Sequence, residues 1–199
     1  MNKKTINYSA LILVICGIIF SCQTKENKNG HLESTIVQVV KAFKEKDAAT
    51  LNNLIAKDKG LILLFKRGTM NEYSKTDKID FEKPLPEYLP NIHFVTDYKI
   101  KFESLPTFDC ETMKWSKQGL YCDTSKTDSL LSETALNLNQ FRGDSIPESE
   151  IKRFADLEKN SRRIVLSDNE QGELVFYLTL TDNKWYLSML DTVTSDCGA

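Results

Sequence analysis

The C-terminal stretch from residue 164 to residue 190 constrains the fold of this 199-residue chain more than any other part. Three apolar segments, at 164–166, 174–180 and 185–190, are separated by two short polar segments rich in Asp and Asn. Short apolar runs bounded by turn-forming residues predict β-strands, and connections this short join antiparallel neighbours. The stretch therefore predicts two successive β-hairpins.

Amphipathic helical patterns accompany these strands. Ser34 or Thr35 can cap a first helix, and Asp47 can cap a short second one. A later helix is predicted after Pro147, where acidic residues occupy the first turn. Short amphipathic helices need a sheet to cover, because none can bury its apolar stripe alone. The fold class is therefore α+β, with short N-terminal helices and a later helix packed on a mostly antiparallel sheet. This order loosely resembles the NTF2-like or cystatin-like plan, a fold-level analogy that carries no function.

Two middle segments have the character of strands. The continuous apolar run 61–65, between Gly60 and Gly68, predicts a strand that is buried on both faces. Residues 92–102 alternate between apolar and polar side chains, which predicts a strand with one core face and one solvated face.

The polar segment Thr69–Pro90 separates these two strands and contains three prolines. It is too long for a simple turn, and loops of this length are usually functional or mobile. We therefore expect a ligand-binding loop in which Tyr73, Phe81 and Tyr88 supply apolar contacts. The alternative is a loop that folds over the edge of the core.

Three cysteines, Cys110, Cys122 and Cys197, follow the N-terminal region. The segments 108–115 and 120–124 predict a hairpin, and a three-residue loop at 115–117 would place Cys110 opposite Cys122. A four-residue loop at 116–119 would break that match. We expect a Cys110–Cys122 disulfide, with Cys197 unpaired; pairing of Cys197 with either of the other two is the alternative.

The N-terminal 21 residues have the composition of a secretory signal. Lys3 and Lys4 precede an uncharged apolar run from Ala10 to Phe20, and the small residue Ser21 stands just before Cys22. A membrane-spanning helix needs roughly 20 apolar residues, so this run is too short for one and fits the hydrophobic part of a signal.

The sequence Ile19-Phe20-Ser21-Cys22 resembles the lipobox of bacterial lipoprotein precursors, although Phe20 is bulkier than the usual occupant. The resemblance implies cleavage before Cys22 and lipidation of its sulfur. An ordinary secretory signal and an uncleaved anchor are the alternatives. The expected organisation is a signal peptide at 1–21, a flexible polar tether at 22–30, and a single α+β domain at 31–199.

The lipobox resemblance implies a membrane-anchored protein of the cell envelope, expected at the outer membrane with its domain in the periplasm. An acidic run after the cysteine directs some such lipoproteins to the cell surface. Glu26 is the single acidic residue of the tether, so the sequence allows display at the cell surface but gives no support for it. The C-terminal Trp185-Tyr186-Leu187 and the short tail after it resemble uncharacterised envelope lipoproteins of Bacteroides-type bacteria.

Charge and motifs narrow the function classes. The net charge is −2 and becomes −4 when the two lysines of the signal leave, so no nucleic-acid partner is expected. No metal, cofactor or nucleophile motif is present, and we assign no catalytic residue. The first hypothesis is a non-enzymatic module that binds an envelope protein or a glycan. The second is a small-ligand-binding protein or an enzyme, with a pocket between helices and sheet.

Overall fold

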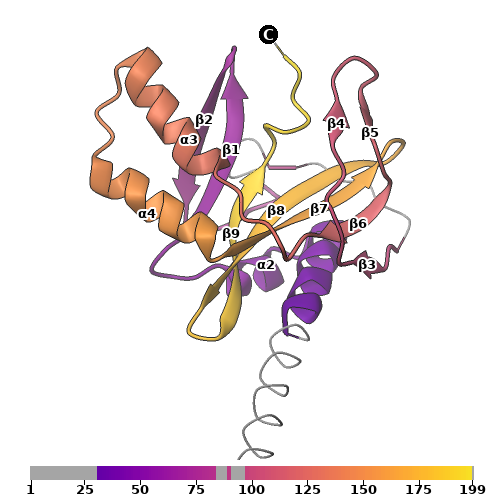
Figure 1. Ribbon diagram of the computed structural model, residues 1–199. Helices are drawn as coiled ribbons and strands as arrows, with labels where there is room; N and C mark the ends of the chain where they lie inside the picture. Colours follow the sequence, from indigo (N-terminus) through magenta and orange to yellow (C-terminus); the bar gives the residue numbers. More distant parts are fainter. Residues whose placement is uncertain (1–30, 84–88, 91–96, 199) are drawn as a thin grey trace, which may run out of the picture.

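The computed structural model describes residues 31–83, 89–90 and 97–198 (Figure 1). The lipobox, Cys22, the tether and Tyr88 lie outside the described residues, as do residues 92–96 of the strand predicted at 92–102. Among its described residues, 97–102, the strand β3 is formed by Ile100–Lys101.

One seven-stranded sheet, in the order β2-β1-β9-β8-β7-β6-β3, forms the centre of the domain. Its pairings are antiparallel except for β1 with β9 and β3 with β6, which are parallel. The other strands are β1 (Leu61–Arg67), β2 (Met70–Thr76), β6 (Gly119–Cys122), β7 (Ser161–Asp168), β8 (Gly172–Thr181) and β9 (Lys184–Asp191).

The two predicted C-terminal hairpins are confirmed as β7–β8 and β8–β9. Asp182 and Asn183 connect β8 to β9 with φ angles of 49° and 61°. Two successive residues with positive φ suit the right-handed twist of the strands that they join, and Asp and Asn tolerate this conformation better than other non-glycine residues.

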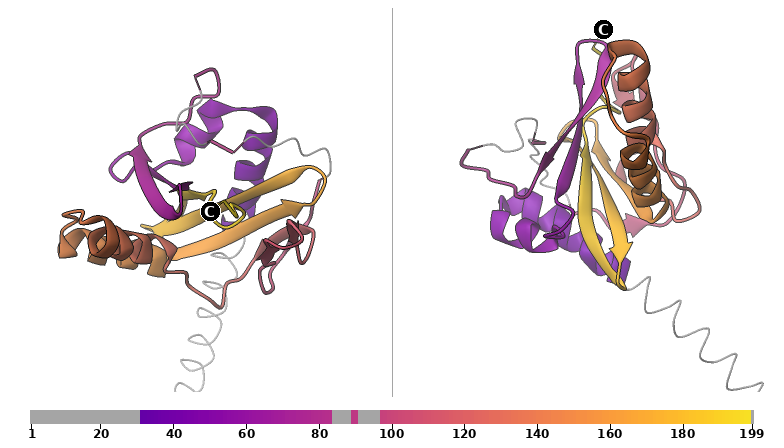
Figure 2. Two further views of the ribbon diagram at one scale, coloured as in Figure 1. Left: turned by 90° about the horizontal axis from the view of Figure 1, so that it is seen from above. Right: turned by 90° about the vertical axis from the view of Figure 1, so that its left-hand side faces the viewer.

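Helices cover both faces of this sheet (Figure 2). Residues 31–45 and α2 (Ala48–Leu54) lie on one face. On the other face lie α3 (Leu130–Asn137), the π-helical turn η1 (Leu138–Arg142) and α4 (Glu148–Lys159). A small two-stranded sheet, β4 (Phe108–Asp109) with β5 (Lys114–Trp115), lies on that second face beside them. The α+β class and the mostly antiparallel sheet are thus confirmed, and the NTF2-like or cystatin-like plan stays a prediction.

Strand β1 shows why both faces must be covered. Leu61, Leu63 and Phe65 pack with the N-terminal helices. Ile62 and Leu64 point the other way and pack with α3 and α4. Successive strand residues alternate between faces, so a continuous apolar run requires protein on both sides. The prediction of a strand buried on both faces is confirmed.

Two carboxylates secure the starts of helices. Asp47 caps α2 as predicted, and its Oδ1 accepts from the backbone N–H of Thr50 at 3.0 Å. Helix α3 is capped from a distance instead: Glu158 of α4 accepts from the backbone N–H of Leu131 and the hydroxyl of Ser132, both at 2.6 Å. Glu158 therefore joins α4 to α3 through the otherwise unpaired N–H groups of a helix start.

The prediction of one long loop at Thr69–Pro90 was wrong. Its first part, Met70–Thr76, forms β2, which pairs antiparallel with β1 through a tight turn at Gly68. Gly68 has a φ of 62°, which glycine adopts without strain. The polar composition of β2 hid the strand, because an edge strand is held by backbone hydrogen bonds to a single neighbour and exposes much of its side-chain surface.

The Cys110–Cys122 disulfide was also wrong: Cys110 pairs with Cys197, and Cys122 is a free, buried thiol. The predicted hairpin does not form. Phe108 pairs with Trp115 in the small sheet, whereas Cys122 lies in β6 and pairs with Ile164 of β7. Because the chain turns back before residue 114, Cys110 sits at the tip of the small sheet, within reach of the C-terminal tail.

Candidate functional site

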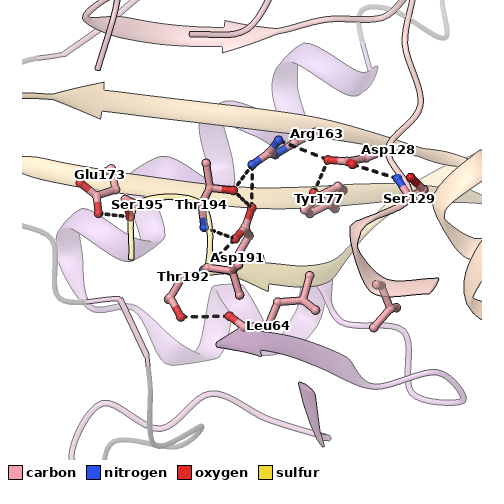
Figure 3. Close-up of polar contacts among 12 residues, drawn as sticks. Leu64, Asp128, Ser129, Arg163, Glu173, Tyr177, Asp191, Thr192, Thr194 and Ser195 are labelled. Atoms are coloured by element: carbon pink, nitrogen blue, oxygen red, sulfur yellow. Dashed lines mark hydrogen bonds and ion pairs between the residues drawn. The ribbon is translucent and has the colours of Figure 1, made fainter. Parts of the chain in front are cut away.

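Arg163 lies at the centre of a polar cluster on the face of the sheet that carries α3 and α4 (Figure 3). From β7, its Nη2 donates to Oδ2 of Asp191 at 2.7 Å, and its Nη1 lies 3.2 Å from Oδ2 of Asp128. The side chain of Asp191 is 0% exposed. A carboxylate buried to that degree requires a cation and hydrogen-bond donors to remain charged.

The rest of the cluster supplies those donors. Oδ1 of Asp191 accepts from the backbone N–H groups of Val193 at 2.9 Å and Thr194 at 3.0 Å. The hydroxyl of Tyr177 donates to Oδ2 of Asp128 at 2.6 Å, and burial, above all, raises the pKa of Tyr177 well above its ordinary value. The acids, the phenol and the guanidinium therefore bind one another. They fasten the C-terminal tail and the start of the α3 segment to the central strands.

A second group of polar side chains surrounds open space. A pocket of about 240 Å³ lies between α4 and the sheet. Its apolar lining consists of Ile62, Phe154, Leu157 and Leu180. Its polar lining consists of Lys59, Arg153, Asp156, Asn160, Thr179 and Thr181. Small-molecule sites combine apolar walls, which bury the ligand, with polar groups that fix its orientation, and this pocket has both.

Lys59 is one of the two basic residues that line this pocket. It ends the turn after α2, where its backbone N–H donates to the carbonyl of Ala56 at 3.1 Å, and its ammonium donates to Oγ1 of Thr181 at 2.8 Å. No ion pair joins Lys59 to another described residue. Arg153, by contrast, donates through Nε and Nη2 to both carboxylate oxygens of Glu150, at 2.8 and 2.6 Å. The pocket thus presents one ammonium group without an anionic partner among the described residues.

The predicted binding residues do not meet in one site. Tyr73 lies in β2 and packs edge-on against Phe154, with ring centroids 5.1 Å apart, on the α4 side. Phe81 packs edge-on against Phe43 at 6.0 Å, on the side of the N-terminal helices. Tyr73 and Phe81 therefore lie on opposite sides of the sheet, and the expected common binding surface was wrong for this pair. Tyr88 lies outside the described residues.

Sequence reasoning missed the pocket residues. Lys59 stands in the polar connector Lys57-Asp58-Lys59, and Arg153 stands in an amphipathic helix, where a solvated charge is the ordinary expectation. The only local signal was Gly60, which places Lys59 directly before a buried strand. That Lys59 meets Thr181 depends on β1 pairing with β9, two strands that are far apart in the sequence, and no local pattern contains that pairing.

Within the ranges that the structure describes, no group of three or more His, Cys, Asp or Glu side chains could hold a metal ion. No helix in those ranges has the length and apolarity needed to cross a bilayer.

The chain was compared with protein families, curated proteins and solved structures. No family model matches it, no curated protein matches it, and no solved structure matches it.

Proposed function

We propose that the protein is a lipid-anchored lipoprotein of the bacterial cell envelope whose domain, residues 31–199, is a non-enzymatic binding module. The observation that carries the proposal is Ile19-Phe20-Ser21-Cys22, placed directly after a positively charged and then apolar segment. Each buried CH₂ of an acyl chain contributes about 0.8 kcal/mol, so two or three chains on Cys22 anchor a protein stably where one would not. The proposed location is the outer membrane, with the domain in the periplasm.

The cysteine pairing supports an exported protein. Disulfides form and persist in oxidising compartments such as the periplasm, and Cys110–Cys197 joins residues 87 positions apart. The remaining thiol, Cys122, is completely buried in β6, and burial raises its pKa to about 12. A thiol that is protonated and shielded from oxidants is compatible with such a compartment.

The binding role is supported by the pocket between α4 and the sheet. The pocket combines apolar walls with Lys59, whose ammonium has no carboxylate partner among the described residues. Groups of this kind hold and orient a ligand through burial and charge. Besides a small ligand in this pocket, we propose an envelope protein or a glycan as the partner of the domain.

The experiment that tests the anchor is labelling of growing cells with radioactive palmitate. Cys22→Ala should abolish the label on this protein, because no thiol remains at the lipobox. Cys16→Ala is the matched control: it removes a cysteine of the same signal outside the lipobox and should leave the label unchanged. A Cys22→Ala chain that is still labelled would contradict the proposal, as would a mature N-terminus at another residue.

A further inference from the structure

We infer that the pocket between α4 and the sheet binds a monocarboxylate on a short apolar tail, with the carboxylate on Lys59. The inference gives the proposed binding role a ligand class and rests on that role. It does not depend on the lipid anchor.

The size and lining of the pocket indicate a ligand with a short apolar tail. Ile62 and Phe154 are almost fully buried, and they form apolar walls together with the half-buried Leu157 and Leu180. The pocket has a volume of about 240 Å³, below the roughly 300–1,000 Å³ of sites for drug-sized ligands, so it suits a small ligand. A six-carbon carboxylate is such a ligand, and its chain would replace water along the apolar walls.

The charges around the pocket indicate a ligand whose head group carries one negative charge. The ammonium of Lys59 donates to the hydroxyl of Thr181, so a carboxylate can bind it without breaking an ion pair among the described residues. Arg153 also lines the pocket and adds a second positive charge, reduced by its pairing with Glu150. Asp156 also lines the pocket and opposes a doubly charged anion. This balance favours one negative charge on the ligand.

A carboxylate on a short apolar tail has two natural sources, a free short-chain acid and the C-terminal apolar residue of a peptide. Hexanoate represents the first and N-acetyl-leucine the second. 1-Hexanol serves as the uncharged analogue with the same tail. Comparison of the three probes separates the contribution of the carboxylate from that of the apolar chain.

The test is saturation-transfer difference NMR on the full chain in lipid nanodiscs, with empty nanodiscs as the blank. A ligand of this size should bind with a Kd on the order of 1 mM. Lys59→Met keeps the apolar stem and removes the charge, and it should weaken hexanoate about tenfold, as loss of one charge-assisted hydrogen bond predicts. It should leave 1-hexanol unchanged. Lys57→Met, two residues away and outside the pocket lining, is the matched control and should change neither.

A second pair of variants tests the same charges in the opposite direction. Asp156→Asn should tighten hexanoate about twofold by removing a like charge, while Asp58→Asn should not. N-acetyl-leucine binding more tightly than hexanoate would identify the peptide C-terminus as the source, and the reverse order would identify the free acid.

Three results would overturn the inference: no binding of either carboxylate, equal affinities for hexanoate and 1-hexanol, or equal effects of Lys59→Met and Lys57→Met. These failures are distinguishable from failure of the anchor. A chain that is labelled at Cys22 but binds no carboxylate refutes the ligand class alone. A chain that is unlabelled but binds hexanoate refutes the anchor alone, and it can be titrated without nanodiscs.

Discussion

Replacing Arg163 by methionine should lower the free energy of unfolding by about 3 kcal/mol at neutral pH. The change removes the guanidinium 2.7 Å from Oδ2 of Asp191 and leaves that carboxylate, whose side chain is 0% exposed, without a cation. Removing one partner of a buried ion pair costs about 3–5 kcal/mol. The lower end applies because the backbone N–H groups of Val193 and Thr194 still reach the carboxylate.

The measurement is equilibrium urea unfolding, followed by circular dichroism with the disulfide intact. With a slope of about 2 kcal/mol per molar urea, a loss of that size lowers the midpoint by about 1.5 M. Arg162→Met is the matched control on the same strand. Arg162 donates to the carbonyl of Ser161 at 2.7 Å and forms no ion pair among the described residues, so its loss should cost less than about 1 kcal/mol.

A double variant separates charge from packing. Asn at position 191 is neutral and its side-chain oxygen can still accept from the tail N–H groups, so Arg163→Met with Asp191→Asn should be more stable than Arg163→Met alone. The reasoning is refuted if Arg162→Met and Arg163→Met shift the midpoint equally. It is also refuted if adding Asp191→Asn destabilises the Arg163→Met chain further.

The remaining predictions concern the cysteines and one buried acid. Non-reducing mass spectrometry should recover a Cys110–Cys197 linked peptide, while Cys122 resists alkylation until the chain unfolds; a linked peptide containing Cys122 would contradict the structure. Loss of the disulfide through serine at both positions should cost roughly 4–5 kcal/mol, the loop entropy for 87 residues, measured by urea unfolding. Burial, above all, raises the pKa of Glu158, so the stability of the native protein should fall as pH rises from the unfolded pKa through this higher folded pKa. Glu158→Gln should remove that part of the pH profile, and an unchanged profile would exclude Glu158 as its source.

Local chemistry made several elements predictable. Asp47 caps α2 and the turn after β8 uses Asp182 and Asn183, because caps and turns depend on side chains within a few residues. Strand β2 was missed because sequence reasoning detects only such local signals. Its polar residues carry no local strand signal, and its structure comes from the neighbouring backbone of β1.

The sequence by itself determined the α+β class, the C-terminal strands and the requirement that β1 be covered on both faces, because hydrophobic periodicity and turn residues act over short distances. Only the tertiary structure decided which cysteine Cys110 meets, and which charges line the pocket beside α4. Those outcomes depend on strand order and on where the chain turns back, and they bring together residues such as Lys59 and Thr181 that are 122 positions apart. The free energy that selects this arrangement comes from burying the whole sheet between its two layers, which no single segment encodes.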